Sequence, residues 1–169
     1  MPARLVVSSP KTISRERGEA AVVAAAVYGL SAVELELEED PAARFLDQVR
    51  RQVEAMRLVD ALSRELPNRE YYHLHITELD LYFDGYNFCF GLAMDKSAVV
   101  STYRLKHPRP ERFIERLKKE VIHEVGHMLG LKHCPNPRCV MYFSNTILDT
   151  DMKGVEPCPR CRNLLMKWP

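Results

Sequence analysis

Eleven residues, HEVGHMLGLKH at positions 123–133, place the strictest demand on the fold of this chain. His123 and His127 are four residues apart, so both imidazoles project from one face of a helix, where they can bind one zinc ion. Gly130 can adopt a positive φ, which ends the helix and lets His133 approach the same metal. The spacing therefore predicts a three-histidine zinc site with one open coordination position, which is typical of catalytic zinc.

Glu124 follows the first predicted ligand directly, so it should lie beside the metal rather than on it. A carboxylate at this position can take a proton from water bound to the metal. We therefore predict that Glu124 is the catalytic base. The alternative, that these are ordinary core or surface histidines, fits a bare HExxH better than it fits the longer pattern.

The cysteines indicate a second metal site. Four of the five cysteines fall in the last 36 residues with the spacing C-x4-C-x18-C-x2-C; they are Cys134, Cys139, Cys158 and Cys161. Two close pairs separated by a loop are typical of a closed tetrahedral thiolate site, which predicts a structural zinc ion. Two disulfides, or a redox dithiol at CPRC, are the alternatives. Cys89 stands alone, and we expect it to be a small buried apolar residue.

The remaining pattern predicts an α+β (α/β-like) domain with a mixed sheet, in the order β-α-β-α-β-β-β-α-loop-α. The expected strands are 3–9, 32–39, 71–83, 86–94 and 97–105, and the expected helices are 14–29, 41–66, 112–129 and one from 159. The length predicts a single domain over 1–169, with 1–130 ending in the active-site helix and 131–169 forming a C-terminal part. Residues 84–85 should form a turn. His73 and His75 alternate on a strand, where core or surface placement is expected and a ligand pair is the alternative.

Charge and hydropathy exclude several classes of function. The formal net charge is +1, which gives no bulk attraction to nucleic acid or to an acidic membrane. The most apolar stretch, at 20–30, is too short to span a bilayer, and the N-terminus lacks a signal-peptide core, so we expect a cytoplasmic protein. We expect the acidic stretch at 34–40 to be solvated surface, together with a basic group formed by Arg109, Arg112, Arg116, Lys118 and Lys119.

The combined motif resembles that of the archaemetzincins, zinc metallopeptidases of the metzincin clan. The resemblance is carried by HEVGHMLGLKH joined directly to C-x4-C, a methionine and C-x-x-C, and more weakly by ITELDLYFDGYNFCFGLA and VVSTYRL. It implies a mixed twisted sheet over an active-site helix, with Met141 as the Met-turn methionine beneath the metal. It also implies that the strand near 87–94 is an edge strand over the cleft, to which a peptide substrate can add.

The predicted activity is hydrolysis of peptide bonds with two Zn²⁺ ions, one catalytic and one structural, on a peptide or protein substrate. We expect a monomer with no membrane partner and no pro-segment. Tyr142 could assist an oxyanion, although a packing role is expected. The alternatives are a non-catalytic binding module stabilised by zinc, and a zinc-dependent ribonuclease whose basic helix contacts phosphates. Glu124 and the near-neutral charge argue against nucleic acid.

Overall fold

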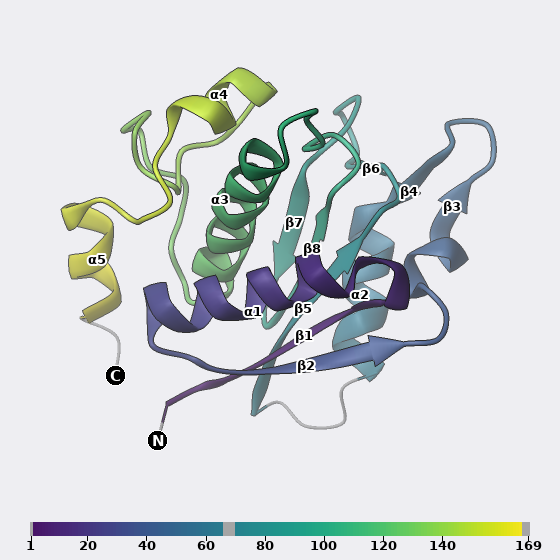
Figure 1. Ribbon diagram of the computed structural model, residues 1–169, viewed down its shortest axis with the longest axis horizontal. Helices are drawn as coiled ribbons and strands as arrows, with labels where there is room; N and C mark the ends of the chain where they lie inside the picture. The colour runs from purple at the N-terminus through teal and green to yellow at the C-terminus, as the bar shows by residue number, and fades with distance from the viewer. Residues whose placement is uncertain (1, 66–69, 167–169) are drawn as a thin grey trace.

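The computed structural model describes residues 2–65 and 70–166, and it is built around a five-stranded mixed sheet (Figure 1). The strand order is β2-β1-β5-β8-β7. The strands are β1 (Arg4–Pro10), β2 (Ser31–Leu37), β5 (Tyr71–Thr77), β7 (Gly91–Met94) and β8 (Ser97–Ser101). β2, β1, β5 and β8 are parallel to one another, whereas β7 pairs antiparallel with β8 and forms one edge. The predicted fold class and the predicted edge strand are therefore confirmed.

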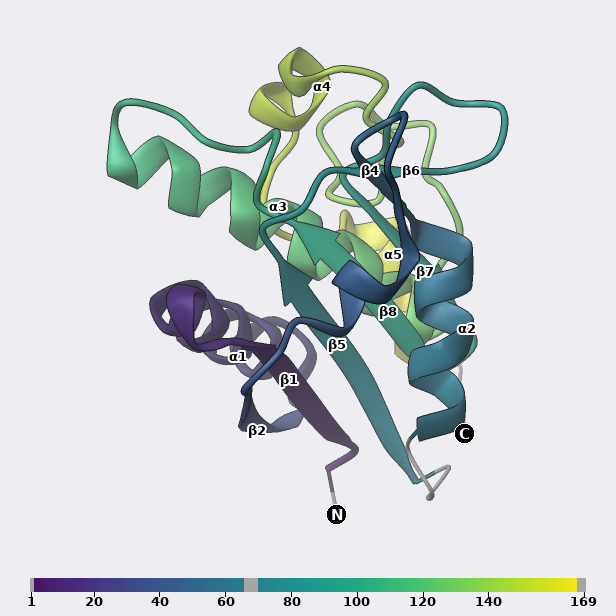
Figure 2. The ribbon, with the colours of Figure 1, turned by 90° about the vertical axis from the view of Figure 1, so that its right-hand side faces the viewer.

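Helices cover both faces of this sheet. α1 (Ser14–Tyr28) and α3 (Pro110–Met128) lie on one face, and α2 (Ala55–Glu65) lies on the other, as Figure 2 shows. Because β1 and β2 are parallel, their connection requires a crossover, which α1 supplies. Apolar side chains that alternate along the central strands are fully buried in the core between the sheet, α1 and α3; they include Leu5, Val7, Leu74 and Ile76. Within the described residues, no helix is long and apolar enough to cross a membrane.

α3 is the best-predicted element, because its apolar residues recur at helical spacing. Its C-terminal half is buried almost all round, since the sheet covers one side and the C-terminal segment covers the other. Gly130 follows the helix with a φ of 99°, so the predicted chain reversal is confirmed. Downstream, α5 (Pro159–Met166) is the expected last helix, and α4 (Ile147–Met152), which begins with a capping box, was not predicted.

The predicted helix at 41–66 is wrong over its first half. The structure has a 3-10 helix, η2 (Pro41–Phe45), followed by β3 (Leu46–Asp47) and β4 (Gln52–Glu54) before α2 begins. The Asp40 carboxylate accepts the Ala42 N–H and starts η2, and the Asp47 carboxylate accepts two N–H groups in the turn between β3 and β4. Val49, one of the apolar residues at helical spacing, is 94% exposed in that turn. The predicted end at Leu66 lies outside the described residues.

Three predicted strands are shorter than expected. The stretch 71–83 divides into β5 and β6 (Leu81–Tyr82), and β6 joins β3 and β4 in a separate three-stranded sheet. The stretch 86–94 becomes a strand only at Gly91, and the stretch 97–105 ends at Ser101. The division follows from side-chain hydrogen bonds: the Thr77 hydroxyl accepts the Leu79 N–H and turns the chain out of β5. Residues 84–85 form the predicted turn, in which Gly85 has a φ of 86°.

His73 and His75 belong to a buried polar cluster on β5, as the core interpretation predicted. The Ser8 hydroxyl lies 2.7 Å from Nε2 of His73 and 2.8 Å from Nδ1 of His75. Nε2 of His75 lies 2.8 Å from the Asp40 carboxylate, which is also bonded by Thr77. The cluster therefore attaches the 40–45 segment to the sheet, and neither histidine belongs to a candidate metal group among the described residues.

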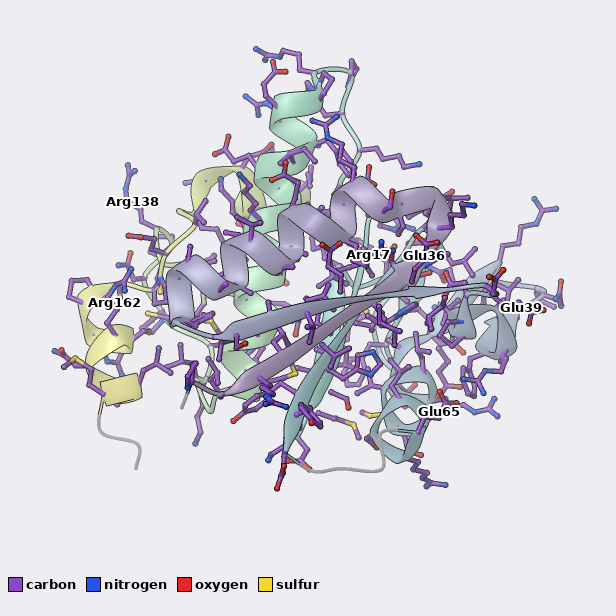
Figure 3. All side chains as sticks on the ribbon, turned by 60° about the horizontal axis from the view of Figure 1, so that its bottom comes forward. Arg17, Glu36, Glu39, Glu65, Arg138 and Arg162 are labelled. Carbon is purple, nitrogen blue, oxygen red and sulfur yellow. The ribbon has the colours of Figure 1, made fainter. Side chains whose placement is uncertain are left out.

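The charged stretches are only partly the solvated surface that was expected. Arg17 of α1 is buried and lies beside Glu36 of β2, pairing with Glu34 and Glu36 at 3.1 and 3.4 Å (Figure 3). In the basic group, Arg116 and Lys119 are buried, so the prediction is wrong for both. Arg116 makes two bonds of 2.8 Å to Asp151, and Lys119 donates to backbone carbonyls of α4, so both residues hold α4 on α3.

Candidate active site

Three imidazoles converge where α3 ends. His123 and His127 come from successive turns of the helix, and the reversal at Gly130 brings His133 to the same point. The ring centroids lie 4.6 Å apart for His123 and His127, 4.7 Å for His127 and His133, and 5.3 Å for His123 and His133. One nitrogen from each ring lies within 4.8 Å of the others, so the predicted three-histidine cluster is present.

Backbone carbonyls orient two of these rings. Nδ1 of His123 donates to the Val140 carbonyl, and Nδ1 of His127 donates to the Leu131 carbonyl, both at 2.8 Å. Both Nε2 atoms are therefore left free to bind a metal, and they lie 3.1 Å apart. Tetrahedral bonds of about 2.0–2.1 Å separate two nitrogen ligands by about 3.3 Å, so the nitrogen positions fit zinc.

The rings are held in the form that binds metals. Burial lowers the pKa of His123 well below its usual range, and the nearby Lys153 ammonium lowers it further. Burial also lowers the pKa of His133, to about 4. The imidazoles are therefore neutral near pH 7, which zinc binding requires.

The Glu124 carboxylate is buried beside this cluster, against the edge strand. Burial raises its pKa well above the usual range, the neighbouring Glu120 carboxylate raises it further, and Lys153 opposes the shift. A divalent cation at the imidazoles acts in the same direction as Lys153 and favours the ionised carboxylate. A Cβ placed on Gly91 of β7 would lie 2.9 Å from both Cγ and Oε1 of Glu124, so the strand approaches this side chain as closely as glycine allows.

A cavity of about 590 Å³ lies over the three histidines, between β7 and the segment at 143–145. Both Glu120 and Glu124 reach it, and no lysine or arginine is among its lining residues. Its other walls are mainly aromatic and come from the loop before β7 and from the segment after Met141: Phe83, Tyr86, Phe88, Phe90 and Phe143. The Phe143 ring lies 5.1 Å from His133 and 6.1 Å from Tyr86, so aromatic side chains connect the two sides of the cavity.

Met141, which the resemblance makes the Met-turn methionine, packs against α3 at Gly126. Its side chain is fully buried, and a Cβ on Gly126 would lie 2.5 Å from its sulfur. Tyr142 is half-buried and does not line the cavity; its carbonyl accepts a hydrogen bond from Lys153. Cys89 is half-buried and lines the cavity, rather than lying fully in the core as expected, and burial raises its pKa to about 12.

Four thiols meet in the C-terminal part, as their spacing predicted. The sulfurs of Cys134 and Cys158 are 3.9 Å apart, and those of Cys139 and Cys161 are 3.8 Å apart. All four lie within 4.8 Å of one another, and every cysteine is free, so the two-disulfide alternative is wrong. Zn–S bonds of about 2.3 Å separate tetrahedral sulfurs by about 3.8 Å, so this cluster also fits zinc.

The sequence interpretation missed a buried ion pair behind His123. The Lys153 side chain is fully buried, and its ammonium lies 3.2 Å from Glu120 and donates to the Tyr142 carbonyl at 3.1 Å. No local signal identifies such a lysine, because a lone lysine beside a glycine is typical of an exposed loop. The close contacts at Gly91 and Gly126 were missed as well, although a glycine inside a strand or helix is itself a sign of close approach.

Comparison with known proteins gives consistent matches. A family model described as peptidase family M54 matches residues 37–167. An archaemetzincin of Pyrobaculum aerophilum is 50% identical over 125 residues, which cover 73% of this chain and 77% of that protein. The crystal structure of an archaemetzincin from Methanopyrus kandleri has a TM-score of 0.87 at 33% identity and covers 98% of this chain and 94% of its own. A second, from Archaeoglobus fulgidus in complex with malonate, has a TM-score of 0.84 at 32% identity, covering 95% and 98%.

Proposed function

The chain belongs to peptidase family M54, a family of zinc metallopeptidases, and we propose that it hydrolyses peptide bonds with Glu124 as general base and general acid. The observation that carries this proposal is the convergence of three neutral imidazoles beside a buried carboxylate on the floor of one cavity. In this proposal His123, His127 and His133 hold the catalytic zinc. The four cysteines hold a second zinc that has only a structural role.

The proposed reaction divides the work between metal and protein. Zinc supplies Lewis acidity, which lowers the pKa of water and polarises a carbonyl group. Glu124 accepts the proton of the attacking water and then donates it to the leaving amine nitrogen. Its burial keeps competing water away, and the contact with Gly91 holds its carboxylate between the imidazoles and the edge strand.

The substrate is proposed to lie along β7. This strand pairs with β8 on one side only, so its other edge has free backbone N–H and C=O groups beside the cavity. An extended peptide can pair with such an edge, which fixes the scissile bond relative to the strand. We further propose that 1–169 acts as a single monomeric domain in which 131–169 forms a C-terminal part with the Met-turn and the four-cysteine site.

The cavity also bears on the ribonuclease alternative. Phosphate recognition relies on lysine or arginine, and neither type lines the cavity. The buried Arg116 and Lys119 are bonded to α4, which removes two of the five residues of the expected basic group from phosphate contact. A peptide is therefore the better fit to this cavity.

The test compares Glu124→Gln with the parent protein and with Glu111→Gln, a control at an exposed carboxylate near the start of the same helix. Peptide-library cleavage and zinc content are measured for each. Losing a general base costs roughly 10²–10⁴-fold in rate, so Glu124→Gln should lose turnover while keeping two zinc ions. Equal cleavage by Glu124→Gln and the parent would overturn the mechanism. Two zinc ions without cleavage by the parent would favour the binding module.

A further inference from the structure

Val140 lies between the two metal-binding clusters and belongs to the structure of both. Its carbonyl accepts the Nδ1–H of His123 at 2.8 Å, which leaves Nε2 of that ring free to bind a metal. The residue before it, Cys139, provides one of the four thiols. Val140 is completely buried, so this hydrogen bond is shielded from water. One peptide unit therefore separates a thiol of one cluster from the acceptor that orients a histidine of the other.

Two further connections join the clusters. His133 and Cys134 are adjacent in sequence, and the Cys134 N–H donates to the Met141 carbonyl at 3.0 Å. The Cys139 sulfur accepts the Met141 N–H at 3.4 Å and the Cys158 N–H at 3.2 Å. The backbone from His133 to Met141 is thus held at both ends by groups of the thiol cluster.

Outside the thiol cluster this segment is held by the burial of Val140 and Met141 and by few hydrogen bonds, of which the Gly154 N–H to the Arg138 carbonyl, at 2.8 Å, is the shortest between backbone groups. The described residues from 131 to 146 form no helix or strand, and 135–138 are exposed. The Val140 N–H makes only a long bond, 3.3 Å, to the Glu156 carbonyl. A metal ion bound by all four thiols would close a loop between the two cysteine pairs and so restrict the backbone of residues 133–141. Without that ion, this backbone would have more conformational freedom. The position of the Val140 carbonyl therefore depends on whether a metal ion joins the four thiols.

We propose that metal occupancy of the four-cysteine site sets the zinc affinity of the three-histidine site, with Val140 as the positioning residue between them. When the thiolates are joined, the Val140 carbonyl stays in line with Nδ1 of His123, and His133 stays on the third ligand position. When no metal joins the thiolates, the Val140 carbonyl and His133 become more mobile. Zinc that binds the three histidines must then order both groups, which lowers its affinity. The proposal rests on the proposed function for the two ligand sets, and it makes no use of peptide hydrolysis.

The test measures metal affinity directly. Zinc is titrated into metal-free protein against a chromophoric chelator, and cobalt(II) spectra identify which site fills, because thiolate ligands give a charge-transfer absorption that imidazoles lack. Coupling between two binding sites is commonly about 5–150-fold, so Cys158→Ser should weaken the histidine site at least fivefold. Asn163→Ser, at an exposed position of α5 outside both clusters, should keep both sites at parent affinity. A folded Cys158→Ser protein that binds histidine-site zinc as tightly as the parent would overturn the proposal.

Reciprocity supplies a second test that does not depend on the folding of the cysteine variant. Coupling free energies between two sites are equal in both directions. His133→Ala, at an exposed side chain, keeps the histidine site empty. Its four-cysteine site should therefore bind zinc more weakly than that of parent protein whose histidine site is filled, by a factor similar to that found above. An unchanged affinity there overturns the coupling. If the two sites are coupled but no peptide is cleaved, the proposed function fails and the coupling stands. If the two sites bind zinc independently and cleavage depends on Glu124, the coupling fails and the proposed function stands.

Discussion

Gly91→Ala tests how closely the edge strand must approach the proposed base. The added Cβ would lie 2.7 Å from the Val99 carbonyl oxygen and 2.9 Å from both Cγ and Oε1 of Glu124. Favourable contacts of a carbon atom begin at about 3.5 Å, so each neighbour must retreat by roughly 0.5 Å or more. Val99 is fully buried in β8 between two strands, so most of the movement should fall on Glu124 and on the edge strand itself.

The magnitude follows from the size of this displacement. A misplacement of about 1 Å in a reacting group can cost about 10²-fold in rate, and overpacking a core costs about 1–3 kcal/mol. We therefore expect kcat of the Gly91→Ala variant to fall by about 10–100-fold, which corresponds to about 1.4–2.7 kcal/mol in the activation barrier. KM should change less, and both zinc ions should remain, because the three atoms nearest to the new methyl group belong to Val99 and Glu124 and not to a histidine.

The assay is steady-state cleavage of one peptide, with zinc content and thermal unfolding measured on the same samples. Gly18→Ala is the matched control, because its Cβ would lie 3.6 Å from Glu34 Oε1, which is an ordinary contact. Glu34 lies on β2, at the opposite edge of the sheet from β7. That variant should cleave like the parent and be no less stable, since alanine is preferred to glycine inside a helix by about 0.5–1 kcal/mol. A Gly91→Ala variant with two zinc ions and kcat within twofold of the parent would refute the argument.

Three further perturbations address the surroundings of the site. Gly126→Ala places a Cβ 2.5 Å from the Met141 sulfur, so it should lower the thermal unfolding temperature and the histidine-site zinc affinity together. Lys153→Met leaves Glu120 as an unpaired buried charge, which should destabilise the fold by about 3–5 kcal/mol in urea unfolding, and adding Glu120→Gln should recover part of that loss. Burial alone would raise the pKa of Asp40, but hydrogen bonds from β5 outweigh it and hold the pKa below its usual value. A carboxyl of this kind stabilises the fold above its unfolded pKa of about 3.9 and loses that effect as pH falls further, so the stability deficit of Asp40→Ala should be largest near neutral pH and shrink between about pH 5 and pH 2.

Both clusters were predictable because histidine and cysteine are typical metal ligands and because they recur at short separations in the sequence. His123 and His127 lie on one helix, and the positive φ of Gly130 is a local requirement that one residue type meets. Each cysteine pair is equally local in sequence, and the sulfur separations of 3.8 and 3.9 Å between the two pairs match a tetrahedral site of four thiolates. The packed α3 was predictable for a similar reason, since its apolar period matches the face that the sheet covers.

The surroundings of the clusters were harder to predict because they depend on contacts between distant segments. Lys153 is buried only because Glu120, 33 residues earlier, lies opposite its ammonium. Nothing in the residues around Lys153 distinguishes it from a solvated lysine. Gly91 likewise owes its importance to a carboxylate on α3, and its own neighbours in sequence identify it only as a strand glycine. In both cases the residue owes its role to a contact with a residue far away in the sequence, so the neighbouring residues do not reveal it.

Three of the wrongly predicted stretches share one location and one cause. The 3-10 helix after Asp40, the turn at Asp47 and the break after Thr77 all lead toward the three-stranded sheet and the aromatic loop that lines the cavity. Each is formed by a side-chain oxygen that accepts a backbone N–H, so hydrophobic periodicity carries no record of it. The candidate metal ligands in this chain can therefore be read from spacing, while the aromatic loop that lines the cavity follows polar turns that spacing does not record.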